Sequence, residues 1–229
     1  SNIAFGSWAM SSGVVTGSQN VAIGMCAGQN ISSGASNLFM GQCSGMYSTT
    51  AKCNVFLGYI AGKCRQFGNH NIGIGNSALR GTSTPSNNSG SNNIALGHGA
   101  GCKVKTGADN IALGRLSLGN GDVTGSANVT LGHESGYNLI SANYNVFFGN
   151  YAGRNTTTGS KNIAIGADAM FNGTVTGSEN IAIGALAGKI LSSGSGNILI
   201  GCKSGCRVTS GSRNIAIGHN VELPSATDN

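Results

Sequence analysis

Short apolar segments alternate with polar, glycine-rich segments along the whole chain. Each apolar segment follows an asparagine, reads apolar, variable, apolar, as at residues 111–113 and 163–165, and is closed by a glycine. This period of two predicts a three-residue β-strand whose outer side chains share one face and whose middle side chain points to the other. We expect the middle side chain to point outward.

The segment recurs thirteen times, at intervals of 17 or 18 residues except for 22 residues between Asn71 and Asn93. The asparagines that open the repeats are Asn2, Asn20, Asn37, Asn54, Asn71, Asn93, Asn110, Asn128, Asn145, Asn162, Asn180, Asn197 and Asn214. Such a short period indicates a stack in which each coil buries its core only against its neighbours. We predict an all-β fold, a β-solenoid of thirteen short coils, with residues 1–229 forming a single repeat domain.

Fixed columns of residues predict the turns of each coil. A corner glycine stands four residues after every asparagine, and a further glycine precedes ten of the twelve later asparagines by three residues. Because glycine tolerates positive φ, we expect both columns to be corners, and the asparagine amides to bond from coil to coil as a ladder. Representative structural positions are Asn20, Gly24, Asn93, Gly97, Asn162, Gly166, Asn180 and Gly184.

A longer cycle of 52 residues overlies the repeat, with intervals of 18, 17 and 17 residues. In the longer coils a large apolar residue replaces a second glycine, which otherwise stands four positions after the corner: Met10, Leu79, Leu118 and Met170. The middle strand residue is large in the third coil of each cycle: Phe39, Phe147 and Leu199. We expect these large residues to form an outward ridge or a seam between chains.

Composition separates this chain from ordinary globular and disordered proteins, with 39 glycines, 9% charged residues and a net charge of +6. A coil of about 17 residues encloses a thin core, so lateral association of several chains is expected. Neither end reads as a polar capping coil, which indicates a segment of a longer fibre. The chain contains no apolar run that would predict membrane insertion.

The repeat Asn-(Ile/Val)-Ala-(Ile/Leu)-Gly-x-x-Ala-Gly, at residues 20–28, 93–101 and 180–188, resembles the head repeats of trimeric autotransporter adhesins. It is also similar to repeats in the tail fibres of phages and large algal viruses, which its longer period favours. The resemblance covers nearly the whole chain. It implies a left-handed β-roll, a homotrimer around a common axis, an extracellular or virion-surface location, and attachment to a host surface.

Seven cysteines offer two disulfide candidates. Cys26 and Cys43 share a column in adjacent coils, where the ladder spacing of ~4.8 Å suits the Cα separation of a disulfide. Cys202 and Cys206 flank one corner. The alternative is that all seven are small buried apolar residues. We expect no metal or cofactor, because paired Cys-x-x-Cys ligands are missing from the sequence.

Basic residues cluster just after the second glycine column and predict a stripe along one edge of the solenoid: Lys63, Arg65, Lys103, Lys105, Arg154 and Lys189. Acidic glycans, sulfated polysaccharides or lipopolysaccharide phosphates suit such a stripe. The alternative is that cations at the turns provide solubility. Nucleic acid is not expected, since aromatic residues are not interleaved with the basic ones.

Glu134, Tyr151 and Asp168 occupy one column on three successive coils and suggest a sugar-binding platform, or else a contact with a neighbouring subunit. The two carboxylates would lie ~9.6 Å apart, the outer limit for inverting glycosidases. No other grouping approaches a catalytic geometry, so we predict that the chain is not an enzyme.

These patterns predict a structural fibre or adhesin segment that displays a repeated surface for attachment to a host glycan or receptor. Two alternatives remain open, a single-chain ice-binding solenoid and a polysaccharide-acting solenoid. Ice-binding solenoids present a flat outward array of threonine or similar residues in a fixed column. Here threonine lies mostly in loops and reaches the middle strand position, taken as outward, only at Thr130.

Overall fold

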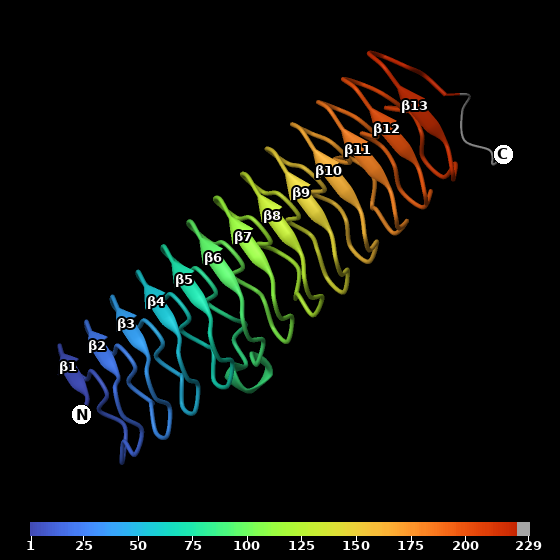
Figure 1. The fold of residues 1–229 in the computed structure, drawn as a ribbon. Coiled ribbons are helices and arrows are strands. Elements are labelled where there is room, and N and C mark those ends of the chain that lie inside the picture. The colour runs from blue at the N-terminus through green and yellow to red at the C-terminus, as the bar shows by residue number, and fades with distance from the viewer. Residues whose placement is uncertain (224–229) are drawn as a thin grey trace. The chain divides into compact units, whose positions relative to one another are not determined.

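The computed structural model describes residues 1–223 and shows an all-β, parallel β-solenoid (Figure 1). The strands are β1 (Ile3–Phe5), β2 (Val21–Ile23), β3 (Leu38–Met40), β4 (Val55–Leu57), β5 (Ile72–Ile74), β6 (Ile94–Leu96), β7 (Ile111–Leu113), β8 (Val129–Leu131), β9 (Val146–Phe148), β10 (Ile163–Ile165), β11 (Ile181–Ile183), β12 (Ile198–Ile200) and β13 (Ile215–Ile217). A single 3-10 turn, η1 (Pro85–Asn87), interrupts the pattern among the described residues. None of these residues belongs to a helix long and apolar enough to cross a membrane.

Two compact units make up the chain, Ser1–Thr124 with β1 to β7 and Gly125–Asn229 with β8 to β13, called unit 1 and unit 2 below. Within each unit every strand pairs in parallel with the next strand of the sequence. Equivalent residues of successive repeats face each other, for example Ile181 and Ile198. The sequence repeat and the structural repeat therefore have the same register.

The strands face the opposite way from our prediction. Their middle residues are buried, including Phe39, Phe147 and Thr130 at 0% exposure, whereas outer residues such as Phe148 remain 49% exposed. A period of two separates the two faces of a strand but does not say which one is inside. The coil decides: its interior holds the middle strand residue together with the small residue three positions after the corner glycine, such as Ala27, and the residue seven positions after it, such as Ile31. The predicted outward ridge and the outward threonine are therefore both wrong.

Complementary volumes in the core account for the 52-residue cycle. A large middle residue lies against a glycine, as a Cβ added to Gly45 would come within 2.6 Å of the Phe39 ring. The coil with small residues receives side chains from both neighbours: a Cβ at Gly188 would lie 2.9 Å from Leu199 and 3.7 Å from Met170. Where the 52-residue cycle holds, coils with a large residue after the corner, small coils and coils with a large middle residue thus fill the core together. Phe56 departs from the cycle, because its ring stacks on that of Phe39 in the preceding coil at a centroid distance of 5.6 Å.

The asparagine column forms a ladder of hydrogen bonds inside each unit. The Asn37 Nδ2 donates to Asn20 Oδ1 at 2.9 Å and to the Ala51 carbonyl at 2.7 Å. The same pattern recurs in unit 2, where Asn197 Nδ2 donates to Asn180 Oδ1 at 2.9 Å. These amides are buried and would destabilise the fold if they lacked partners, so the ladder fixes asparagine at this position.

The two glycine columns serve different purposes. The corner glycine has positive φ, +126° at Gly184, as predicted. The glycine that precedes each asparagine by three residues does not; a Cβ at Gly34 would instead lie 2.6 Å from the Ala51 carbonyl oxygen of the next coil. The left-handed turn there falls on the residue just before the asparagine, such as Ser36 with φ of 57°. Close approach of backbones, and not a corner, selects this second glycine.

Candidate functional site

The outer strand residues give each unit an exposed apolar face. Both columns consist entirely of Ile, Val, Leu, Phe and Met. The most exposed members are Ile3, Phe5, Met40, Ile74, Leu96, Val129, Val146, Phe148, Ile215 and Ile217. Contiguous apolar surface of this kind marks an interaction site in soluble proteins.

A second surface lies at the turns of unit 1, where two hollows adjoin. The first has a volume of about 340 Å³ and is lined by Arg80, Thr82, Ser83, Thr84, Lys103, Lys105 and Asp122. The second, of about 300 Å³, is lined by Ile60, Lys63, Cys64, Arg80, Gly81 and Ser83. Arg80 and Ser83 line both, so the two hollows adjoin, and they are together called the Arg80 depression below.

The 22-residue coil that begins at Asn71 builds one wall of this depression. Its additional residues form a loop around η1, and the buried Asn88 holds that loop in place. Asn88 Nδ2 donates to the carbonyl oxygens of Cys64, Thr82 and Thr84 at 2.9–3.1 Å, and its Oδ1 accepts from the Thr82 N–H at 3.0 Å. The insertion is therefore a fixed part of the surface.

The Arg80 depression carries an excess of positive charge. Lys105 pairs with Asp122 at 2.7 Å, and Lys103 Nζ lies 3.4 Å from Asn120 Oδ1. No carboxylate of residues 1–223 lies within ion-pair distance of Lys63 or Arg80. Burial raises the pKa of the adjoining Cys64 thiol, although both cations oppose the shift, so the thiol stays neutral at pH 7.

Arg65, which the sequence suggested for the basic stripe, does not lie on this surface. Its side chain is fully buried and donates from Nη1 to the Val104 carbonyl at 3.1 Å and from Nη2 to the Gly90 carbonyl. Burial lowers the pKa of Arg65 to about 10, so the guanidinium remains charged at neutral pH. In other coils the equivalent position holds a buried apolar residue, such as Ile31 or Leu139. The two-residue separation of Arg65 from Lys63 did not predict that the Arg65 side chain points into the core.

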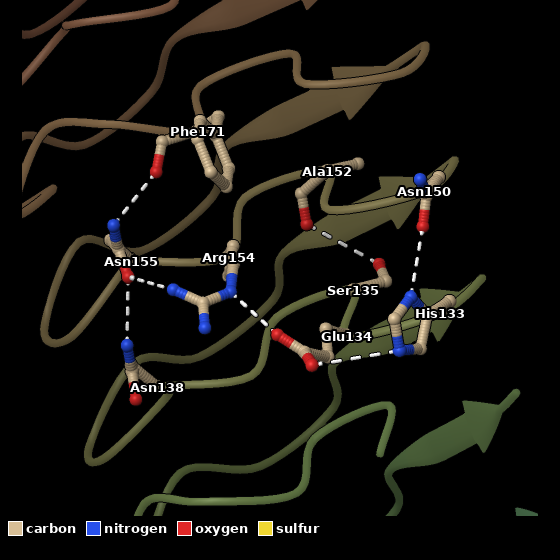
Figure 2. A network of polar contacts seen from close by, with 9 residues as sticks. All are labelled: His133, Glu134, Ser135, Asn138, Asn150, Ala152, Arg154, Asn155 and Phe171. Atoms are coloured by element: carbon tan, nitrogen blue, oxygen red, sulfur yellow. Dashed lines mark hydrogen bonds and ion pairs between the residues drawn. The ribbon is translucent and has the colours of Figure 1, made fainter. Parts of the chain in front are cut away.

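In unit 2 the residue equivalent to Arg80 is Arg154, and its charge is paired within the protein (Figure 2). Arg154 Nε donates to Glu134 Oε2 at 2.7 Å, and the Glu134 side chain is only 14% exposed. The Arg154 guanidinium also lies over three rings, 5.1 Å from the centre of Tyr137 and 5.9 Å from those of Tyr151 and Phe171. Its charge is compensated within the protein.

Neighbouring side chains complete the Arg154 cluster shown in Figure 2. Asn155 Oδ1 accepts from Asn138 Nδ2 at 2.7 Å, while Asn155 Nδ2 donates to the Phe171 carbonyl at 2.8 Å. The His133 ring contacts that of Tyr151 at a centroid distance of 5.1 Å. The structure thus brings Glu134 and Tyr151 into one cluster, whereas Asp168 lies in the next coil, where its N–H donates to the Asn150 carbonyl at 3.0 Å.

A smaller hollow of about 250 Å³ in unit 2 includes the predicted Lys189. Its other lining residues are Leu186, Lys203, Cys206, Arg207, Asn220 and Glu222. The Arg207 guanidinium pairs with Glu222 at 3.2 Å, so a carboxylate again offsets part of the positive charge.

Arg80 is the residue that sequence reasoning missed. It stands five positions after its corner glycine, in the same column as Lys63, Arg154 and Lys189. Leu79 replaces the second glycine just before it, so the motif of a cation after a glycine was not recognised. When the repeats are aligned on their corner glycines, with Gly75 in this coil, Arg80 falls in the column of the other three cations.

All seven cysteines lie in the described part of the chain and are free thiols. Burial raises the pKa of Cys43, and the adjacent Cys26 thiol raises it further, so the first disulfide candidate is a pair of neighbouring thiols. Cys202 and Cys206 are not joined either. Within residues 1–223, no group of three His, Cys, Asp or Glu side chains could hold a metal ion.

Comparison with known proteins finds no family model, no curated protein and no solved structure that matches this chain.

Proposed function

We propose that this chain is a segment of a structural fibre or adhesin that assembles as a homotrimer and attaches to glycans or a receptor on a host surface. The observation that carries the proposal is the apolar face formed by the outer strand residues. On this proposal the protein works outside the cell or on a virion surface, and it has no catalytic role.

The chemistry of this face favours a second copy of the chain as its partner. Charged and polar side chains do not occur in its two columns, so an apolar partner is required. The side chains repeat at the strand spacing of ~4.8 Å. Another solenoid of the same sequence offers ridges and grooves with the same spacing. The resemblance to adhesin heads supports three copies and a left-handed coil.

Assembly would also serve attachment. Several chains held side by side present several copies of each turn-edge surface, and multivalent contact raises avidity by about 10²–10⁴-fold without any new kind of contact. Glu134, the carboxylate weighed for catalysis, is held by Arg154 at 2.7 Å, which favours a role in the fold.

Retention on an immobilised sulfated polysaccharide under flow tests both parts of the proposal. The double variant Ile163→Lys/Ile198→Glu places charges on the apolar face without changing the net charge. It should dissociate at least about tenfold faster than wild type, because loss of assembly removes avidity. The matched control Thr158→Lys/Thr176→Glu changes two exposed loop residues and should behave as wild type. Equal dissociation of all three proteins would contradict the proposal.

A further inference from the structure

The Arg80 depression has the shape and charge of a ligand site, and we propose that it binds sulfate or phosphate ester groups carried by a saccharide. This inference rests on the proposed attachment function and adds the class of ligand and the residues that recognise it. Arg80 is the central contact, Lys63 acts on one side, and Lys103 and Lys105 act on the other.

The dimensions favour a small ligand over a lone ion. The two hollows, of about 340 and 300 Å³, lie at the lower end of the range for ligand pockets, about 300–1,000 Å³. Arg80 and Ser83 line both hollows, so a ligand in either hollow lies next to the same guanidinium. A saccharide with two anionic groups can place one in each hollow and contact the shared guanidinium from either side.

The charges favour oxyanions. Four half-buried cations line the depression against one carboxylate, Asp122, which already pairs with Lys105 at 2.7 Å. A guanidinium presents a planar fork of donors that matches sulfate and phosphate, while ammonium groups act as point charges around it. A concave surface lined by one sign of charge also concentrates the field at its centre.

The walls are fixed before a ligand arrives. Asn88 fastens the inserted loop through hydrogen bonds to Cys64, Thr82 and Thr84. Beneath the loop, the buried Arg65 joins the carbonyls of Gly90 and Val104, which belong to different coils. A site held in this way loses little conformational entropy on binding, so modest contacts give useful affinity.

Calorimetric titration of the full chain with a heparin-derived tetrasaccharide tests the site. We expect one binding site per chain, with an affinity about tenfold or more weaker in Arg80→Ala and several-fold weaker in Lys103→Ala. The control is Lys52→Ala, which removes an exposed cation of unit 1 outside the depression and should change affinity less than about twofold. Equal losses in Arg80→Ala and Lys52→Ala, or no binding by wild type at low salt, would overturn the inference.

Two further ligands define the chemistry. A phosphorylated tetrasaccharide that binds with the same dependence on Arg80 identifies phosphate esters as a second source of the oxyanion, while its failure to bind assigns the site to sulfate. An oligogalacturonate, which carries carboxylates alone, should bind at least about tenfold more weakly; equal affinity would refute the preference for esters. Binding is counted per chain, so the test of this site and the test of assembly can fail separately. An assembled chain that does not bind refutes only the site. An unassembled chain that still binds through Arg80 refutes only the assembly.

Discussion

Arg80 in unit 1 and Arg154 in unit 2 occupy the same column of the repeat but have different surroundings. Arg80 lies between two hollows with further cations around it and no carboxylate of residues 1–223 within ion-pair distance. Arg154 pairs with Glu134 at 2.7 Å and lies over aromatic rings. One position of a repeat can therefore carry an arginine with cationic surroundings in one coil and an arginine with a compensated charge in another.

The difference arises from the neighbouring coils. Near Arg80 the 22-residue coil adds a loop and creates concavity, whereas near Arg154 coils of regular length bring Glu134, Tyr151 and Phe171 together. In a solenoid, side chains in the same column contact residues one coil away, which lie 17 or more positions distant in sequence. The surroundings of one column can thus change from coil to coil, through an inserted loop near Arg80 and through side chains near Arg154.

Arg80 and Arg154 are equivalent only if both units have the same frame, and substitution of a corner glycine in each unit tests this. In Gly75→Val and Gly184→Val the new Cβ would lie 2.6–2.7 Å from the backbone of the next coil at a φ of +126 to +127°. We expect each variant to lose about 3–5 kcal/mol of unfolding free energy in chemical denaturation. Thr157→Ala, in a loop, should lose less than about 1 kcal/mol. Equal tolerance would contradict the coil model.

The two units also differ in the burial of an arginine: Arg65 in unit 1 is fully buried, whereas the Arg154 side chain in unit 2 is 29% exposed. Arg65→Ala should destabilise unit 1 by about 2–4 kcal/mol, because it leaves a cavity and removes the Arg65 hydrogen bonds to the Val104 and Gly90 carbonyls, of which Gly90 keeps a bond from Asn71 Nδ2. Arg154→Ala should cost about 1 kcal/mol, since that side chain is 29% exposed and screened by solvent. Urea denaturation measures both changes. Arg65→Leu, which keeps most of the volume, is the control and should lie between Arg65→Ala and wild type.

Removal of the carboxylate that compensates Arg154 should make unit 2 resemble unit 1. Glu134→Gln keeps the shape of the side chain but releases the guanidinium charge, so we expect a new, weak site for the sulfated tetrasaccharide and a loss of about 1 kcal/mol in stability. Calorimetry on Arg80→Ala/Glu134→Gln isolates the new site. If binding does not rise above that of Arg80→Ala, charge compensation is not what distinguishes the two regions.

The smallest effect is expected at the one carboxylate of the Arg80 depression. Asp122→Asn releases Lys105 from its ion pair and should strengthen tetrasaccharide binding about two- to fivefold. Stability should change by less than about 0.5 kcal/mol, because the Asp122 side chain is 54% exposed and solvent screens the pair. The same titration measures the affinity, and an unchanged or weaker affinity would show that Lys105 does not contribute to the site.

Much of the fold could be predicted from the sequence because the repeat encodes it directly. The asparagine column gave the ladder, and the corner glycine gave the turn, since hydrogen bonding and backbone strain act at single positions. The alternation alone could not predict which strand residues, the middle one or the outer two, point into the core. A comparison of volumes would have helped, because Ala182 and Gly188 leave room that Leu199 and Met170 fill.

Less of the candidate site could be predicted. Lys63 was identified from its column and Lys103 and Lys105 from their nearness to it, and the structure places all three on the lining of the Arg80 depression. Arg65 was assigned to the same surface from its sequence neighbourhood, yet it turns into the core. The pairing of Arg154 with Glu134 joins residues 20 positions apart, and nothing in the spacing distinguishes this carboxylate from Asp168.

The central claim is that the apolar strand face is covered by other copies of this chain. Sedimentation equilibrium, with and without reductant, measures the molar mass in solution and tests the claim most directly. We predict three times the chain mass of 22.9 kDa in both conditions, since the cysteines are free thiols. A mass of 22.9 kDa at micromolar concentration would contradict the account, because the face would then be stable in water without a partner.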